Sequence, residues 1–384
     1  MKIAIQTLVG HTNYGCILQA YALQTVLKRM GHEVVILNRR ENYPSVKLFI
    51  YRICSLIKCL YRIYILRDKR YVLCNPLNHA YIVKKEESVD FSLMEQFVNE
   101  KLNYSPLFRS SRALKKYVDK QDFDCFIVGS DQVWREIYVP NIYDSFLGYL
   151  SKENKAKKIA YAASFGTDDN PISVNKLTCC WWLAKRFDAI SVREKSGIQL
   201  VKDLFGLSSI HVLDPTLLLE KCDYESIINN EMLGKNKVVS YILDKTRDKE
   251  DIIQTITESL SVENLNLTDY PLNKKGISQP FSVSQWLEAI SNAKFVITDS
   301  FHGSVFSIIF KKPFIIIANK ERGLERFISL LDTLELNSRL IYKLEDFLLR
   351  RDELLEKPKY KDVCYKLNIA KTDSLQFLIK HLND

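Results

Sequence analysis

The sequence lacks the features of a membrane-spanning or disulfide-rich protein. None of its apolar runs reaches the roughly 18 uninterrupted residues expected of a membrane span. Its nine cysteines, an odd number, have neither the density of a disulfide scaffold nor the spacing of a metal site, and the adjacent Cys179 and Cys180 form no CxxC motif. The opening MKIAIQTLVGHTNYG has a short apolar stretch that contains Gln6, and it lacks a small-residue cleavage site. We therefore expect a cytoplasmic protein without a bound metal.

Two further absences argue against a nicotinamide-dependent enzyme and against a nucleic-acid-binding protein. The loop after the first expected strand contains Gly10 and Gly15 but does not match the dinucleotide fingerprint GxGxxG, so a nicotinamide cofactor is not expected. We find no nucleic-acid-binding motif, and the positive charge is spread along the chain. The 55 Lys and Arg residues against 46 Asp and Glu give a net charge of +9. This charge suits an acidic ligand or an anionic membrane surface without choosing between them.

The residues that are present predict an α/β fold with two domains. A chain of 384 residues is too long for one ordinary core, and its 47% hydrophobic and 26% charged content is normal for a globular protein. Runs with strand character alternate with stretches of helical periodicity and end in a terminal helix. We expect parallel sheets in two domains, 1–178 and 179–384. The expected elements include strands beginning near residues 2, 33, 123, 158, 187, 211 and 237, a strand ending near residue 298, and helices over 13–31, around 248–260 and over 372–382.

The segment 297–317, ITDSFHGSVFSIIFKKPFIII, places polar residues between two apolar runs. It predicts a buried strand ending near Thr298, a tight turn, a helix from Gly303 and a second strand after Pro313. Asp299, Ser300 and His302 then lie at the carboxyl end of a parallel strand and at a helix N-terminus, where open α/β sheets bind ligands and particularly anions. The alternative is a capped helix with a hydrogen-bonded core histidine.

The same arrangement, a strand followed by a polar residue and a helix, recurs along the chain. Two sheets whose strand ends face each other across a cleft would gather these residues into one site. The residues at such ends are Asn13, Asp131, Ser164, Arg193 and His302.

Structural alternatives apply to each of them. Asn13 and Asp131 are also good helix N-caps, and Arg193 could form an ion pair with Glu194. Asp214, before Pro215, is typical of a turn.

Residues 46–70, VKLFIYRICSLIKCLYRIYILRDKR, read as a basic amphipathic helix. Lys47, Lys58 and Arg62 fall on one side of a helical wheel, opposite an apolar side. Such a helix can lie on an anionic membrane, which would make the protein peripheral on the inner face of the membrane. The alternative is a helix packed on its own domain.

Six motifs resemble the polysaccharide pyruvyl transferase family, and they occur in that family's order from residue 3 to about 330. They are NYGCILQAYALQ, FIVGSDQVW, IAYAASFG, ISVREKSG, VLDPTLLL and ITDSFHGSVFSIIFKKPFI. The resemblance implies two Rossmann-like domains facing across a cleft, as in GT-B glycosyltransferases. It also implies transfer of a pyruvyl group from phosphoenolpyruvate to two hydroxyls of a sugar, which gives a ketal and releases phosphate. The sugar would belong to a surface or capsular polysaccharide or to its lipid-linked precursor.

The chemistry of this donor suits the candidate residues. Phosphoenolpyruvate carries a carboxylate and a phosphate, so we expect Arg193 and the helix that starts at Gly303 to bind it. His302 is the candidate acid that protonates carbon 3, and Asp131 or Asp299 could accept the hydroxyl proton. Asp299 would also orient the imidazole. The other candidate substrate-binding residues are Ser300, Gly303, Asn13, Tyr14, Ser164, Arg322 and Arg326.

One departure from the family pattern affects the donor site. Characterised branches of the family have an Arg two residues before this histidine, and here that position is Ser300. Arg322 or Arg326 could supply the charge, or this branch could use another donor. Two other functions stay open: a glycosyltransferase that uses a sugar nucleotide on the same architecture, and a non-catalytic protein of polysaccharide assembly.

Overall fold

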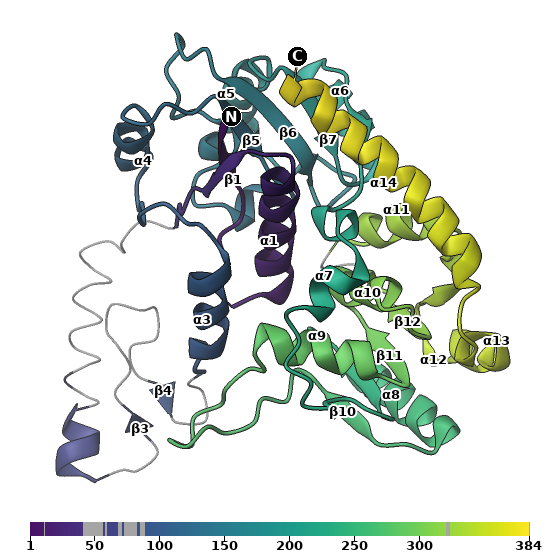
Figure 1. Cartoon of the computed structure of the whole chain (residues 1–384). Helices are drawn as coiled ribbons and strands as arrows, with labels where there is room; N and C mark the ends of the chain where they lie inside the picture. The colour runs from purple at the N-terminus through teal and green to yellow at the C-terminus, as the bar shows by residue number, and fades with distance from the viewer. Residues whose placement is uncertain are drawn as a thin grey trace.

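The computed structural model describes residues 1–10, 12–40, 57, 60–67, 71–72, 83–84, 89–319 and 323–383. Two parallel sheets flanked by helices form its two halves, one above the other in Figure 1. The predicted α/β fold with parallel sheets is therefore confirmed.

The first sheet has six parallel strands in the order β2-β1-β5-β6-β7-β8. Every residue of β5 is buried, as is typical of parallel sheets with helices on both faces. The strands are β1 (Lys2–Gln6), β2 (Glu33–Ile36), β5 (Cys125–Val128), β6 (Lys157–Ala163), β7 (Ala189–Val192) and β8 (Ile210–His211). The helices of this half are α1 (Tyr14–Arg29), α3 (Ser92–Lys101), α4 (Ser111–Val118), α5 (Val174–Ala184) and α6 (Lys195–Phe205).

The second sheet has five parallel strands in the order β10-β9-β11-β12-β13. They are β9 (Val238–Tyr241), β10 (Asn264–Asn266), β11 (Phe295–Thr298), β12 (Phe314–Ile317) and β13 (Leu340–Ile341). The helices around them are α8 (Arg247–Leu260), α9 (Val283–Asn292), α10 (Phe301–Ile309), α11 (Glu325–Leu334), α12 (Leu344–Leu349) and α13 (Arg351–Leu355).

The two sheets divide the chain later than the boundary expected at 178. Strands β7 and β8 pair with β6 and so belong to the first sheet, and the second sheet starts only at Val238. The 3-10 turn η5 (Pro215–Leu218) and the short helix α7 (Lys221–Glu225) connect the halves. Sheet membership depends on pairing between distant segments, which the local pattern of β7 and β8 does not reveal.

The C-terminal helix also crosses between the halves. Helix α14 (Tyr360–Asn383) starts beside the second sheet and runs back along the first one (Figure 1). Lys157 on β6 donates from Nζ to the carbonyl of Leu382 at 3.0 Å, and the Leu213 amide donates to Ser374 Oγ at 2.9 Å. The predicted terminal helix is present and fixes one half to the other.

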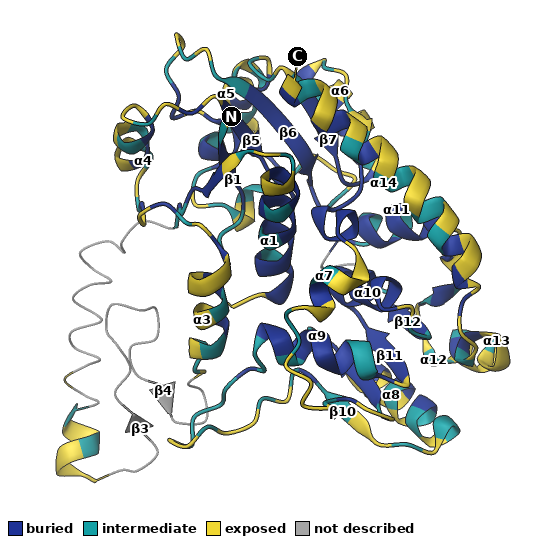
Figure 2. Ribbon diagram, in the orientation of Figure 1, coloured by how far each residue is buried: buried dark blue, intermediate teal, exposed yellow. Residues whose placement is uncertain are grey.

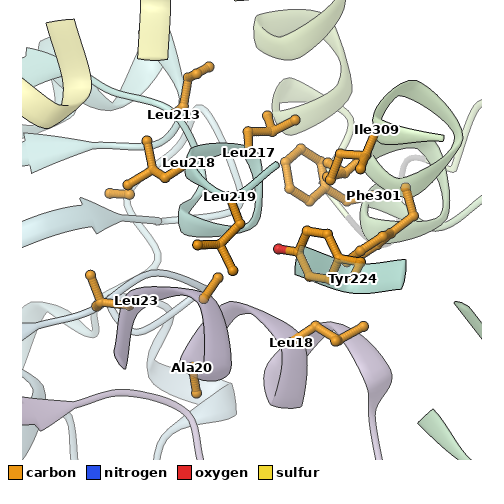
Figure 3. Packing of buried hydrophobic residues seen from close by; sticks show 14 of the residues in the cluster. Leu18, Ala20, Leu23, Leu213, Leu217, Leu218, Leu219, Tyr224, Phe301 and Ile309 are labelled. Carbon is orange, nitrogen blue, oxygen red and sulfur yellow. The ribbon is translucent and has the colours of Figure 1, made fainter. Parts of the chain in front are cut away.

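A continuous apolar cluster lies between the two sheets. Helix α1, the η5 segment and helix α10 contribute to it, and Leu18, Leu217 and Phe301 are among its members (Figure 3). Figure 2 shows α1 and α10 mostly buried, whereas α14 exposes one face. Burial on this scale holds the two halves in one arrangement.

Both sheets place their strand-order reversal at the shared junction. The order reverses between β1 and β5 in the first sheet and between β9 and β11 in the second. Ligands of open α/β sheets bind outside the carboxyl ends of strands at such a reversal. Helix α1 follows β1, and helix α10 follows β11, so the N-terminus of each helix lies at a reversal.

Most of the segment 46–70 lies outside the described residues, including Lys47 and Lys58, so the helix expected there stays a prediction. The described part contains a π-helical turn, η1 (Tyr61–Ile65). Its large side chains Tyr61, Tyr64 and Ile65 are exposed. Among the described residues, no helix combines the length and apolar character needed to cross a bilayer. Strands β3 (Tyr71–Val72) and β4 (Val83–Lys84) form a separate antiparallel pair.

Candidate active site

The polar residues at the strand ends meet at the junction of the two halves. Asp131 follows β5, Arg193 follows β7, and Asp214 follows β8, all in the first half. His302 comes from the first turn of α10 in the second half. All four residues are at most 7% exposed, so the site is buried.

Arg193 contacts three carboxylates. Its Nη1 donates to Asp214 Oδ2 at 2.9 Å, Nη2 lies 3.6 Å from Asp131 Oδ1, and Nε lies 3.5 Å from Glu194 Oε1. The expected pairing with Glu194 is thus present, and Asp214 and Asp131 add two further negative charges beside the guanidinium. Within the described part of the chain, the buried Nε and Nη2 make no hydrogen bond. Because buried donors are normally paired, these two N–H groups are suited to an anionic ligand.

His302 faces Asp214. Its Nε2 lies 3.7 Å from Asp214 Oδ2, just beyond hydrogen-bonding distance. Burial by itself would raise the pKa of Asp214, but His302 and Arg193 outweigh it and hold this pKa far below its ordinary value. Asp214 is therefore ionised and can balance a positive charge on the imidazole. Its other oxygen accepts from the Thr216 amide at 3.0 Å and from the Thr216 hydroxyl at 2.6 Å, so the carboxylate is fixed.

Gly15 allows His302 to reach this position. A Cβ atom at Gly15 would lie 2.0 Å from Nδ1 of His302. Any larger residue in the first turn of α1 would therefore displace the ring. From the sequence, Gly15 was expected only as part of the loop before the helix. The available signal was a glycine at the start of a helical pattern, where glycine is less favourable than alanine by up to about 1 kcal/mol.

Arg326, on α11, brings a second guanidinium to the site. Its side chain is 7% exposed and lies 5.5 Å from the centre of the Phe301 ring, while Arg193 lies 4.7 Å from the same ring. Burial and the charge of Arg193 lower the pKa of Arg326 to about 10. It stays charged at neutral pH. The two cations thus lie beside one aromatic ring, and the carboxylates of Asp131 and Asp214 lie next to one of them, Arg193.

The pKa values of two carboxyls beside these cations, Asp131 and Glu194, shift in opposite directions. Burial would raise the pKa of Asp131, but Arg193 and His302 hold it below its ordinary value. Asp131 also accepts from the Cys16 thiol at 2.9 Å. For Glu194, burial outweighs Arg193 and Ser164, and the pKa is raised. The Ser164 hydroxyl donates to one oxygen of Glu194, and the other oxygen makes no hydrogen bond within the described residues.

Asp299 lies in a separate network and does not contact His302. Its oxygens accept from the amides of Leu243 and Asp244, from Lys249 Nζ at 2.7 Å and from Asn319 Nδ2 at 3.1 Å. The expectation that Asp299 orients the imidazole is therefore wrong, because its side chain points toward β9 and α8. The carboxylate beside the His302 imidazole is instead that of Asp214.

Ser300 and Gly303 shape the turn before α10. The Ser300 hydroxyl caps the helix by accepting from the Gly303 amide at 3.4 Å. A Cβ atom at Gly303 would lie 2.3 Å from Thr298 Oγ1. This glycine thus permits close packing of α10 on β11, and its amide is already used by the cap. The expectation that Gly303 lets an anion approach the backbone is not supported by this geometry.

Of the remaining predicted residues, Asn13 and Tyr14 have structural partners, and Arg322 is not described. Asn13 caps α1 by accepting from the Cys16 amide at 3.2 Å. Tyr14 is 2% exposed, stacks on Trp286 and donates from its hydroxyl to the Phe281 carbonyl at 2.6 Å, so it connects the two halves. Arg322 lies outside the described residues, so its role stays a prediction.

The comparison with protein families agrees with the motifs. Residues 13–321 match the family described as Polysaccharide pyruvyl transferase. The chain belongs to this family. The matched range contains Arg193, Asp214 and His302, and it ends just before Arg326. The chain matches none of the curated proteins with which it was compared.

Three solved structures resemble this transferase along nearly their whole length. The S. aureus MnaA–UDP co-structure has a TM-score of 0.52 at 11% identity, and the match covers 100% of this chain and 97% of that one. A putative UDP-N-acetylglucosamine 2-epimerase from Listeria monocytogenes has a TM-score of 0.51 at 10% identity, and the match covers 94% of this chain and 90% of that one. The UDP-GlcNAc 2-epimerase of Methanocaldococcus jannaschii, in complex with UDP-GlcNAc and UDP, has a TM-score of 0.51 at 13% identity. That match covers 93% of each chain. The likeness shows the fold alone, and the expected GT-B-like architecture is confirmed.

Proposed function

We propose that this transferase moves a pyruvyl group from phosphoenolpyruvate to two hydroxyls of a sugar. The product is a pyruvyl ketal on a surface polysaccharide or on its lipid-linked precursor, and phosphate is released. Family membership supports pyruvyl transfer in general. The observation that carries the choice of donor is the buried pair Arg193 and Arg326 beside His302.

The two guanidiniums match the two anionic groups of phosphoenolpyruvate. Arg193 has two buried N–H groups without a hydrogen bond in the described chain, and Arg326 adds a second charge 5.5 Å from the centre of the Phe301 ring. A guanidinium can bind a carboxylate or a phosphate through two parallel hydrogen bonds. Arg326 thereby replaces the arginine that the family pattern places at position 300.

His302 supplies the proton that starts the reaction. Protonation of carbon 3 converts the CH2 group of the enol to CH3 and makes carbon 2 electrophilic. One sugar hydroxyl adds to carbon 2, and the second displaces phosphate, which leaves with the electron pair of its C–O bond. One of the two hydroxyl protons restores His302, and the other leaves with the phosphate. Ionised Asp214 stabilises the imidazolium form that this step requires.

Asp131 is our candidate for receiving a hydroxyl proton. Its carboxylate lies 3.6 Å from the Arg193 guanidinium, which would bind the donor, whereas Asp299 lies in the separate network with Leu243 and Lys249.

Membrane contact of the 46–70 segment is supported by the exposed Tyr61, Tyr64 and Ile65. The membrane would carry the lipid-linked acceptor. Flotation with anionic vesicles tests this contact, and binding unchanged by Arg62→Gln together with Lys47→Gln and Lys58→Gln would contradict it.

The donor is tested by thermal stabilisation of the purified protein. Phosphoenolpyruvate should raise the melting temperature in a concentration-dependent manner, and UDP-GlcNAc at the same concentration should not. Stabilisation by the sugar nucleotide alone would favour a glycosyltransferase. No stabilisation by either would favour a non-catalytic role.

A further inference from the structure

A cavity lies between the two halves beside the candidate active site. It has a volume of about 230 Å³. Its walls are the loop after β6, with Gly166, Thr167 and Asp168, and the start of α11, with Gly323 and Glu325. The function proposed above does not use these residues.

The two loops of the cavity touch through glycines. Gly166 and Gly323 have φ values of +69° and +87°, which other residues rarely adopt. A Cβ atom at Gly323 would lie 2.2 Å from the Gly166 carbonyl oxygen, and one at Gly166 would lie 1.9 Å from Gln132 Oε1. The backbone of each half therefore approaches the other closely, and the cavity exists only where the halves meet.

The cavity shares a wall with the donor site. The same Cβ position at Gly323 lies 3.3 Å from Nε of Arg326, and the Nε group donates to the Gly323 carbonyl at 3.4 Å. On the other side, Arg135 lines the cavity and donates to Gln132, which directly follows Asp131. A molecule in the cavity would therefore lie next to a donor held by Arg193 and Arg326.

The polar groups of the cavity suit hydroxyls more than anions. Asp168 and Glu325 come from opposite halves and line the cavity together with Arg135, the one cation among its described lining residues. Burial, then Asp168 and Glu194, raise the pKa of Glu325. A second negative charge would be repelled here, whereas hydroxyl groups can donate to both carboxyls. The Arg135 guanidinium lies 4.9 Å from the centre of the half-exposed Tyr138 ring, which offers an apolar face next to these groups.

We propose that this cavity is the acceptor subsite and that it takes a neutral sugar, whose hydroxyls hydrogen-bond to Asp168 and Glu325. This inference rests on the proposed pyruvyl transfer and adds the place and charge of the acceptor. Uronic acids and sugar phosphates are poor acceptors in this arrangement.

The test uses neutral methyl hexosides and the corresponding methyl hexuronides as acceptors. With saturating phosphoenolpyruvate, phosphate release should depend on the neutral glycosides only. Asp168→Asn and Glu325→Gln should each raise KM for the glycoside about tenfold or more, the scale of hydrogen bonds to charged groups. Stabilisation by phosphoenolpyruvate alone should not change. Asp332→Asn is the matched control, since it removes a carboxylate on the same helix that does not line the cavity.

Three outcomes overturn the subsite while the donor assignment survives. One is that phosphoenolpyruvate stabilises the protein but no neutral glycoside supports phosphate release. Another is that hexuronides support phosphate release as well as neutral glycosides do. The third is that KM for the glycoside is the same in both variants and the control. Loss of stabilisation by phosphoenolpyruvate in the wild-type protein would instead overturn the proposed function itself.

Discussion

His302 Nε2 and Asp214 Oδ2 lie 3.7 Å apart, and they belong to different halves of the molecule. The imidazole comes from the start of α10, and the carboxylate comes from the segment after β8. The candidate acid and its counter-charge therefore meet only when the two halves are in contact. This explains why an apolar cluster and helix α14 hold the halves together around so polar a site.

Gly15→Ala should abolish most turnover without unfolding the protein. The added methyl group would lie 2.0 Å from His302 Nδ1 and must displace the ring. Alanine also favours the helix by about 1 kcal/mol, so α1 itself should remain formed. Phosphate release and melting temperature are measured together, with Lys28→Ala, at the exposed end of the same helix, as the control. Unchanged turnover in Gly15→Ala would show that the position of His302 is unimportant.

Arg193→Lys should weaken phosphoenolpyruvate binding while the fold survives. Lysine keeps the charge beside Asp214 but loses the Nε and Nη2 donors, so affinity should fall about tenfold to a hundredfold. Calorimetric titration measures this loss. The control is Arg339→Lys, because Arg339 is equally buried but donates to the carbonyls of Leu354 and Glu356. Equal affinities in the two variants would make Arg193 a structural residue.

Tyr14→Phe should lower stability and leave donor affinity unchanged. The hydroxyl is bonded to the Phe281 carbonyl and is buried, so its removal should cost about 1 kcal/mol of unfolding free energy. Denaturant unfolding and phosphoenolpyruvate titration separate the two effects. A clear fall in donor affinity at unchanged stability would restore Tyr14 to the substrate-binding residues.

Glu194→Gln should change how stability depends on pH. The pKa of Glu194 is raised in the folded protein, so the folded state binds this proton more tightly than the unfolded state. The stabilising contribution is complete below the ordinary value of 4.5 and is lost as pH rises through the raised pKa. The melting temperature of the variant should therefore fall less than that of the wild type as pH rises above 4.5.

Glu136→Gln is the opposite case and serves as the control. Lys176 and Ser173 lower the pKa of Glu136 to about 2, so its contribution is present above 4.5 and lost as pH falls toward 2. Parallel pH profiles of Glu194→Gln and the wild type would mean that the pKa of Glu194 is the same in the folded and unfolded states.

Local patterns predicted the strand-end residues well and their partners poorly. Arg193 and His302 each follow a buried strand, and the switch from strand to helix is visible in the sequence. Asp299 follows the same strand as His302, but successive residues there point to different sides, so its neighbours could not be read from its position. Asp214 and Gly15 act on His302 across the junction of the halves. Such contacts depend on the tertiary arrangement, which no local spacing encodes.

His302 protonates the donor in the proposed reaction, and phosphate release by His302→Asn tests this role most directly. Asparagine keeps a polar side chain in the site, so melting temperature and phosphoenolpyruvate affinity should stay near those of the wild type. Turnover with the same sugar acceptor should fall about a hundredfold or more, the scale of a lost general acid. Phosphate release at the wild-type rate from the folded His302→Asn variant would contradict the role of His302 as proton donor.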